Sequence, residues 1–270
     1  MKILITGGQG FLGRLLAVKL SSHHQIYAPG RAQLDLCDAN SLRAFFDAEC
    51  FDAVIHCAAA GRNATRSHSL EIVDLNLRAF NNLVCHAGKF SKLINIASGA
   101  EFDLDQNIHL AQENQIWSCA PQHSYGLSKN IIARMTQLLP NAINLRLFGC
   151  FDQSESNQRP IKRCQELVRA GQIFSIFGDK FFDFVSVDDL VMMIETVLKN
   201  PITDKDINIV YNKKFMLSEI LKLYCLVHKY DSNLIQVESI DENNYTGSDK
   251  ILSQYALPML GLERSLESYR

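Results

Sequence analysis

A tyrosine and a lysine stand four residues apart in the segment YGLSK, at positions 125 and 129. Side chains at this spacing lie on the same face of a helix and can contact each other. A lysine ammonium beside a phenol favours the phenolate and lowers the tyrosine pKa from its usual value of about 10, as an acid/base catalyst requires. Tyr125 and Lys129 are therefore candidate catalytic residues, although Y-x-x-x-K also occurs by chance on many helices.

A second candidate site is the glycine-rich segment TGGQGFLG, which follows a short apolar run and precedes a segment with helical periodicity. In that context the first glycine of the pattern permits a tight turn, the second lets a pyrophosphate approach the main chain, and the third lets helix and strand pack closely. The N-terminus of the helix favours phosphate. A glycine-rich turn without a ligand is the alternative. The candidate cofactor-binding residues here are Gly7, Gly10, Phe11, Leu12 and Gly13.

One arginine indicates whether NAD or NADP is the preferred dinucleotide. Sites that prefer NAD commonly place Asp or Glu near the end of the second strand, where it binds the ribose 2′-hydroxyl and repels a 2′-phosphate. Here the corresponding place is occupied by Arg31, whose guanidinium can bind a 2′-phosphate with two hydrogen bonds. We therefore expect NADP(H) to be preferred and NAD(H) to be possible. The alternative is that Arg31 is a solvated surface residue.

The elements that must position these residues alternate between apolar runs of strand length and helix-period segments. This alternation predicts βαβ units and the α/β fold class, with a Rossmann-like doubly wound parallel sheet. Strands are expected over residues 2–7, 25–30, 51–60, 92–98 and 142–149, and helices over residues 11–22, 41–49, 69–89 and 124–139.

The alternation breaks after about residue 150, where the polar segment FDQSESNQRP indicates a loop. We expect an NADP-binding Rossmann domain over residues 1–150, to which residues 184–212 return. Residues 151–183 and 213–270 are expected to form a smaller C-terminal α/β substrate-binding lobe. After residue 150 we expect helices over residues 161–171, 188–200 and 217–230, and strands over residues 173–178 and 207–212.

The composition is that of an ordinary globular chain, with 270 residues, 47% hydrophobic side chains and a formal net charge of −2. Without a basic excess, nucleic acid is not an expected partner. The eight cysteines form no C-x-x-C pair and several lie in apolar runs, which predicts buried free thiols, a reducing cytoplasm and no metal site. The N-terminal apolar stretch ILIT is too short for an export signal or a membrane span, so neither is expected.

Taken together, ITGGQGFLG, LDLCD, VIHCAAA, SYGLSK and DFVSVDDLV resemble the extended short-chain dehydrogenase/reductase superfamily, in its NAD-dependent epimerase/dehydratase family. The resemblance covers nearly the whole chain and is nearest to nucleotide-sugar 4-ketoreductases such as GDP-fucose synthase-like enzymes. It implies that Tyr125 exchanges a proton with the substrate oxygen and that Lys129 also holds the nicotinamide ribose. It further implies that the Ser98 hydroxyl hydrogen-bonds the reacting oxygen, where a turn-forming serine is the alternative.

The same resemblance assigns residues to the walls of the cofactor site. Two residues of LDLCD match positions that border the adenine, and the alanines of HCAAA match the strand end on the cofactor's other side. An asparagine on the following helix matches a lining residue, although a helical surface position is the alternative. GRAQLDL also resembles the corresponding stretch of NADPH enzymes of this branch. The residues concerned are Asp35, Leu36, Ala58, Ala59, Ala60 and Asn76.

Two departures from the family's motifs reduce the number of reactions that are expected of this chain. Dehydratases of this branch carry Thr-Asp-Glu where this chain has Ser98-Gly99-Ala100, so elimination of water is not expected. GDP-fucose synthase-like enzymes add a Cys and a His that epimerise neighbouring carbons. Ala100 and Phe151 occupy those places here, which predicts no epimerisation unless Cys150 or His123 substitutes.

A third departure concerns the substrate. The family arginine that binds the nucleotide diphosphate is replaced by Phe182, and Lys180, Arg159 or Arg163 would have to supply the charge instead.

The sequence therefore predicts an NADPH-dependent ketoreductase that converts a nucleotide-linked 4-keto-6-deoxy sugar into the hydroxy sugar, in rare-sugar or surface-polysaccharide biosynthesis. One alternative is an NAD-retaining nucleotide-sugar 4-epimerase, against which Arg31 counts. Another is a non-catalytic NADP-binding sensor or scaffold, against which the intact Ser98, Tyr125 and Lys129 count. By analogy with the family we expect a cytoplasmic homodimer that pairs through the helices containing Asn76 and Tyr125.

Overall fold

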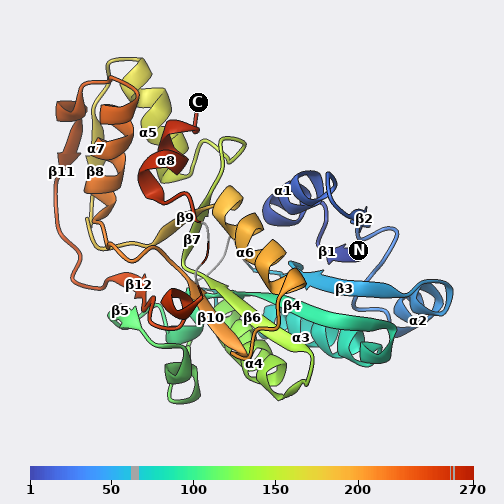
Figure 1. Ribbon diagram of the computed structural model, residues 1–270. Coiled ribbons are helices and arrows are strands. Elements are labelled where there is room, and N and C mark those ends of the chain that lie inside the picture. Colours follow the sequence, from blue (N-terminus) through green and yellow to red (C-terminus); the bar gives the residue numbers. More distant parts are fainter. Residues whose placement is uncertain (62–66, 256, 258) are drawn as a thin grey trace. The chain divides into compact units, whose positions relative to one another are not determined.

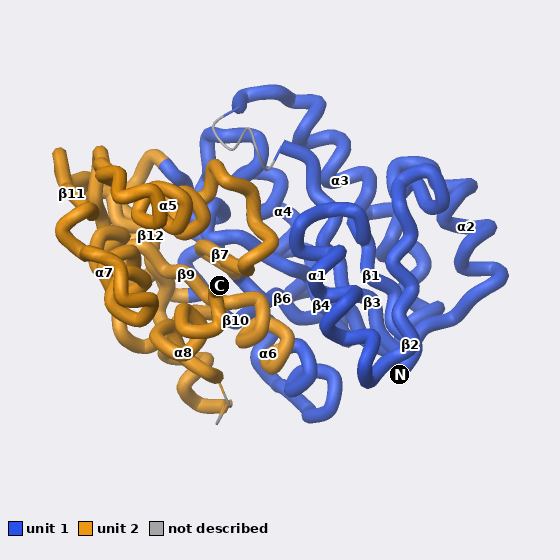
Figure 2. Tube along the Cα trace, turned by 90° about the horizontal axis from the view of Figure 1, so that it is seen from above, with its two compact units in different colours: residues 1–104, 113–146, 194–207 blue, residues 105–112, 147–193, 208–270 orange. Residues whose placement is uncertain are grey.

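The computed structural model describes residues 1–61, 67–255, 257 and 259–270. It divides into two compact units, which are described one at a time (Figure 2). Unit 1 comprises residues 1–104, 113–146 and 194–207, and unit 2 comprises residues 105–112, 147–193 and 208–270. Residues 105–112, which the sequence analysis assigns to the first domain, belong to unit 2 because their strand pairs with a strand near the C-terminus.

A six-stranded sheet forms the core of unit 1, in the order β10-β6-β4-β3-β1-β2 (Figure 1). β1 pairs in parallel with both β2 and β3, and β3 pairs in parallel with β4. The parallel α/β fold class predicted from the sequence is thus confirmed. The strands are β1 (Lys2–Thr6), β2 (Gln25–Tyr27), β3 (Phe51–His56), β4 (Phe90–Ser98), β6 (Ala142–Leu147) and β10 (Asp206–Ile209).

Helices cover both faces of this sheet, which explains why its strands are nearly continuous apolar runs. On one face, Leu4, Phe46, Val54, Phe80 and Ile132 belong to a single buried cluster that joins the strands to α2, α3 and α4. On the other face lie α1 and the end of α6 (Figure 1). The helices are α1 (Phe11–Leu20), α2 (Ala39–Ala48), α3 (Leu70–Val84), α4 (Ser124–Leu138) and α6 (Val187–Lys199), with short 3₁₀ helices η2 (Ala87–Lys89), η3 (Gly99–Phe102) and η4 (Glu113–Trp117).

The strand order reverses between β1 and β3. β2 lies on one side of β1, whereas β3, β4, β6 and β10 follow one another on the other side. In open α/β sheets, ligands bind outside the carboxyl ends of the strands at such a switch point. A ligand site is therefore expected beside the segments that follow Thr6 and His56.

Unit 2 contains three parallel pairs of short strands, β5–β12, β7–β9 and β8–β11. The sequence predicts only one of these strands, because runs of three or four residues cannot be told from loops by periodicity. The strands are β5 (Ile108–Ala111), β7 (Gly149–Phe151), β8 (Phe174–Ile176), β9 (Phe184–Ser186), β11 (Ile235–Val237) and β12 (Tyr245–Gly247), and the remaining helices are α5 (Pro160–Arg169), α7 (Leu217–Val227), η5 (Ser232–Leu234), η6 (Leu252–Gln254) and α8 (Leu262–Glu267).

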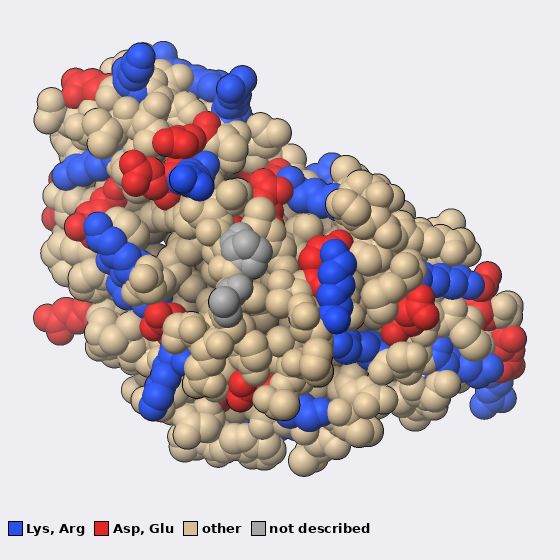
Figure 3. All heavy atoms as spheres, viewed as in Figure 1, with Lys and Arg blue, Asp and Glu red and all other residues tan. Residues whose placement is uncertain are grey.

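The structure shows where the cysteines and the charged side chains lie. All eight cysteines belong to the described residues and none forms a disulfide, but Cys50 and Cys85 are exposed, so the prediction of buried thiols is wrong for them. Cys50 precedes β3 and Cys85 follows the last residue of α3, so both lie outside the elements that form the core. Acidic and basic side chains are interspersed on the face seen in Figure 3. Among the described residues, no helix has the length and apolarity that a membrane crossing requires.

Candidate functional site

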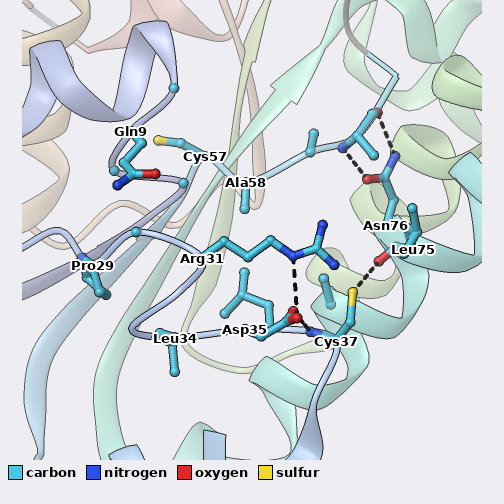
Figure 4. Close-up of a pocket in the computed structure, with 18 residues that line it drawn as sticks. Gln9, Pro29, Arg31, Leu34, Asp35, Cys37, Cys57, Ala58, Leu75 and Asn76 are labelled. Carbon is cyan, nitrogen blue, oxygen red and sulfur yellow. Dashed lines mark hydrogen bonds and ion pairs between the residues drawn. The ribbon is translucent and has the colours of Figure 1, made fainter. Parts of the chain in front are cut away.

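A cavity of about 370 Å³ opens in unit 1 at the carboxyl ends of β1 and β3, which is the switch point of the sheet (Figure 4). Its walls come from the glycine segment after β1, the turns after β2, the end of β3 and one side of α3. Phe11, Leu12 and Gly13 begin α1 and do not line the cavity. The sequence-predicted residues that do line it are Gly7, Gly10, Arg31, Asp35, Leu36, Ala58, Ala59, Ala60 and Asn76.

Three of the glycines are required by close approach of the main chain. A Cβ on Gly8 would lie 2.4 Å from the carbonyl oxygen of Ala28. Gly7 has a φ of +70°, and a Cβ there would lie 2.9 Å from the Cα of Ala58. A Cβ on Gly13 would lie 2.3 Å from the carbonyl oxygen of Gly7. At Gly10 the nearest atom, the carbonyl oxygen of Gly7, would be 3.2 Å away, which is a tight contact but less severe than the other three. The segment is therefore a cradle whose shape depends on Gly7, Gly8 and Gly13.

We expect Gly13→Ala to weaken NADPH binding by at least tenfold, because the added methyl group must push the carbonyl of Gly7 out of the turn. Isothermal titration with NADPH measures this directly. Gly88→Ala is the matched control, since a Cβ at Gly88 meets nothing within 4 Å. Equal affinities for the two variants would show that the turn is not part of the binding site.

Arg31 reaches over the cavity from the turn after β2 (Figure 4). Its Nε donates to Asp35 at 3.3 Å, and the side chain is 73% exposed. The main-chain N–H of Cys37 and the Arg31 guanidinium lower the pKa of Asp35, so the carboxylate is charged near neutral pH. The pair uses only Nε of the guanidinium, and both Nη groups have no other ion pair among the described residues.

Asn76 connects the cavity wall to the helix that carries the candidate catalytic residues. It is buried, and its side chain accepts from the N–H of Ala60 at 2.6 Å and donates to the carbonyl of Ala60 at 3.1 Å. The same amide donates to Ser128 Oγ at 2.9 Å, and that hydroxyl donates to the carbonyl of Tyr125. The alternative of a helical surface position is therefore wrong, and Asn76 holds α3, α4 and the Ala60 segment together.

Ser98 ends β4 and begins η3 as one half of a capping box. Its Oγ accepts from the N–H of Ala100, and its own N–H donates to Glu101 at 2.8 Å. An oxygen that accepts one hydrogen bond can still donate its proton, so the serine is both a turn former and a hydroxyl donor.

A buried ion-pair network supports this turn. Arg146 is fully buried and donates to Glu101 at 2.8 Å and to Asp206 at 2.7 Å. Burial raises the pKa of both carboxyls, and the arginine opposes that effect. The sequence analysis misses all three residues. The pattern S-x-x-E at residues 98–101 is a capping-box signal that identifies Glu101.

The first turn of α4 packs directly on the Ser98 turn. A Cβ on Gly126 would lie 2.5 Å from the carbonyl oxygen of Ala100, and one turn later Asn130 donates to the carbonyl of Glu101. These contacts place Tyr125, the neighbour of Gly126, beside the segment that begins at Ser98. Gly126 is a further positioning residue that the sequence analysis does not identify.

Lys129 lies one turn after Tyr125 and is buried. Its Nζ donates to the carbonyl of Ile96 at 2.6 Å. Burial lowers the pKa of Lys129, and the nearby Glu101 carboxylate raises it. Ser98, Tyr125 and Lys129 do not line the 370 Å³ cavity, so the predicted site residues fall into a set that lines the cavity and three candidate catalytic residues outside it.

His56, at the end of β3, is buried, and this burial together with the charge of Lys129 lowers its pKa to about 3. The unfolded chain protonates its histidines below about pH 6.5, whereas folded His56 stays neutral. Stability from this residue is therefore complete above pH 6.5 and is lost as the pH falls towards 3. We expect unfolding free energy to fall by about 2 kcal/mol more in wild type than in His56→Gln between pH 7 and pH 5. Urea titrations at both pH values measure this difference, and parallel pH dependences would contradict it.

Unit 2 contains the residues predicted for substrate diphosphate binding. Phe182 stacks on Phe184 with ring centroids 4.5 Å apart and packs against Tyr245. Lys180 is paired with Asp241, and Arg159 with Glu155 and the carbonyl of Cys150. Arg163 is exposed and makes no ion pair among the described residues. Of the three cations, Lys180 and Arg159 are thus engaged in ion pairs, and Cys150 is buried in β7.

A model of the NAD dependent epimerase/dehydratase family matches residues 3–211, which is more than half of the chain. The chain belongs to this family. The predicted enzyme class is thereby confirmed. A GDP-L-fucose synthase from Azorhizobium caulinodans is 25% identical over 98% of this chain and 93% of its own length.

Solved structures of similar fold include enzymes of nucleotide sugars. A GDP-mannoheptose C4 reductase from Campylobacter jejuni, with NADP bound, has a TM-score of 0.80 and 18% identity, over 99% of this chain and 96% of that one. A dTDP-4-dehydrorhamnose reductase from Bacillus anthracis, in complex with NADP, has a TM-score of 0.84 and 19% identity over the same shares. At these identities the likeness concerns the fold.

Proposed function

We propose that this family member is an NADPH-dependent reductase of a nucleotide-linked 4-keto-6-deoxy sugar. The observation that carries the proposal is Arg31, which extends over the cavity with both Nη groups available for a 2′-phosphate. The GDP-L-fucose synthase relative and the two reductase structures with NADP support the same reading of the chemistry. The absence of acidic residues at positions 99 and 100 argues against a dehydratase.

The residues around the cavity fit a dinucleotide. The close approaches at Gly7 and Gly13 fix the turn below the cavity, and the cavity wall at Gly10 adjoins the start of α1, where main-chain N–H groups favour phosphate. Asp35 and Leu36 would border the adenine, and Ala58, Ala59 and Ala60 the opposite wall. Bound NADPH would supply the hydride that reduces the keto carbon.

The catalytic roles follow from the positions of three side chains. Tyr125 would donate its proton to the oxygen of the reduced carbon, and the Ser98 hydroxyl would hydrogen-bond that oxygen. Lys129, buried one turn after Tyr125, would favour release of the tyrosine proton and hold the nicotinamide ribose. The capping box leaves the Ser98 proton free to donate, which suits this role.

We expect Arg31→Ala to weaken NADPH binding by about tenfold to a hundredfold, because charged hydrogen bonds to the 2′-phosphate are lost. NADH affinity should change less than threefold. The control is Arg14→Ala, an exposed arginine of α1 that does not line the cavity. Equal losses for both cofactors would assign Arg31 a general structural role and remove the main support for NADPH.

The activity itself is tested with NADPH and a panel of nucleotide-linked 4-keto-6-deoxy sugars, by following NADPH oxidation and the product by NMR. Turnover that consumes one NADPH for each hydroxy sugar supports the reductase. The second candidate is a 4-epimerase that retains NAD, which the Asp35 carboxylate on the same cavity favours. Tightly held NAD in the purified protein, with no net consumption of NADPH, would establish the epimerase instead.

Three further proposals accompany this function. Unit 2 would bind the sugar nucleotide, with exposed Arg163 as the cation available to its diphosphate. The protein would pair with a second copy through α3 and α4, which sedimentation analysis tests. It would work in the cytoplasm, where its free cysteines remain reduced.

A further inference from the structure

A row of four buried polar side chains crosses the central sheet of unit 1, one on each of the neighbouring strands β1, β3, β4 and β6 (Figure 1). We call Thr6, His56, Asn95 and Asn144 the polar row; each is at most 1% exposed. Thr6 lies opposite His56, and His56 lies opposite Asn95, in the parallel register. Buried polar atoms are costly unless they are hydrogen-bonded, so each atom of this row calls for a partner.

Hydrogen bonds at one end of the row fix the orientation of Asn95. Asn144 donates its amide N–H to the carbonyl of Ala133 at 2.8 Å, so its Oδ1 faces Asn95. Asn95 donates to that oxygen at 2.7 Å. The Oδ1 of Asn95 is therefore not engaged by Asn144, and it has no partner among the described residues. It is an acceptor that needs a donor.

Hydrogen bonds at the other end assign the proton of His56. Thr6 Oγ1 accepts from the N–H of Ala58 at 3.4 Å, and its own proton has no acceptor among the described residues other than His56 Nδ1, at 2.9 Å, so we assign the proton of this pair to Thr6. Nδ1 is then the acceptor of the ring, and a neutral imidazole carries its single proton on Nε2. Nε2 also has no partner among the described residues. His56 thus presents a donor on the strand next to the acceptor of Asn95.

Lys129 approaches the same place from α4. Its Nζ is hydrogen-bonded to the carbonyl of Ile96, the residue after Asn95. An ammonium has three donors, and this is one bond. The charged and titratable groups that act on Lys129 are Glu101, Cys57 and Arg146. Glu101 is already engaged by Arg146 and by the N–H of Ser98, so it does not satisfy the remaining donors of the lysine.

We propose that one ordered water molecule is bound here, accepting from His56 Nε2 and from the Lys129 ammonium and donating to Asn95 Oδ1. Three polar partners are what a buried water typically has. His56 is then a positioning residue, because it holds the water that supports the charged form of Lys129. The water site follows from the polar row alone, whereas its effect on catalysis rests on the proposed function.

The test combines crystallography with a binding titration that needs no sugar substrate. Crystals of the wild-type protein, diffracting well enough to show ordered waters, should contain density within hydrogen-bond distance of His56 Nε2 and Asn95 Oδ1. NADPH affinity is then measured against pH for wild type, His56→Met and His56→Gln. His228→Gln is the control, because His228 in unit 2 also makes one hydrogen bond, to the carbonyl of Leu266.

The affinity should fall at the pH where Lys129 loses its proton. In His56→Met the water loses a donor, so this midpoint should move down by about one pH unit. His56→Gln keeps a donor and should restore the wild-type midpoint, and His228→Gln should not change it. Wild-type crystals without the water would overturn the site, and equal midpoints in wild type and His56→Met would overturn its action on Lys129. Failure of the wild-type protein to bind either NADPH or NADH would instead contradict the proposed function, and the crystal would still decide the water site.

Discussion

Tyr125→Phe will lower turnover by about 10²–10⁴-fold, because it removes the hydroxyl that donates the proton while leaving the ring in place. Tyr125 is buried in the first turn of α4, where Gly126 fixes the helix against the Ser98 turn. A phenylalanine fills the same space, so NADPH affinity should stay within threefold of wild type. Stopped-flow kinetics on a substrate found in the panel, together with NADPH titration, separate these two effects.

Tyr27→Phe is the matched control for this experiment. Tyr27 belongs to the same unit, and its hydroxyl accepts from Gln25, away from the catalytic group. This variant should keep wild-type turnover. Turnover within threefold of wild type in Tyr125→Phe would mean that another group supplies the proton, and the assignment of Tyr125 would then be wrong.

Arg146→Met will destabilise the fold by about 3–5 kcal/mol, because it leaves Glu101 and Asp206 buried without their cation. The loss should shrink as the pH is lowered towards 5, since a buried carboxyl without an arginine becomes protonated. Urea unfolding at pH 8 and at pH 5 measures both effects. Glu101 also caps the N–H of Ser98, so the variant should lose turnover as well.

Arg78→Met is the control for Arg146→Met. Arg78 forms an exposed pair with Asp74 on α3, and pairs of this kind contribute little to stability because solvent screens them. An Arg146→Met variant no less stable than Arg78→Met would show that the buried network does not hold the Ser98 turn. If Arg146→Met does not fold, Glu101→Gln offers a milder change, because it keeps the size and a polar group.

The parts of the site that the sequence predicts are those encoded by local patterns. Gly7 and Gly13 could be identified because a turn between a strand and a helix imposes its own spacing, and Tyr125 and Lys129 because one helix carries both. The network of Arg146 could not, since Glu101 and Asp206 come from distant segments and only the folded sheet brings them together. Short strands such as β5 and β12 have the same limitation, because each is stabilised by a partner far along the chain.

Arg31 has one property that the sequence predicts and another that only the fold reveals. Its type and place in the sequence predict a phosphate ligand, but its pairing with Asp35 depends on the turn that follows β2. Asn76 lines the cavity, as its sequence position suggests, and the fold in addition makes it a connector between Ala60 and Ser128.

The last strand of the central sheet has a consequence for how the protein is made. β10 joins the sheet beside β6, although residues 148–193 of unit 2 lie between them in the chain. A nascent chain that has emerged only as far as β6 has an unpaired strand edge, and its Arg146 lacks Asp206. Unit 1 therefore completes its folding only after most of the chain has left the ribosome, and a fragment that ends at residue 150 should aggregate rather than fold.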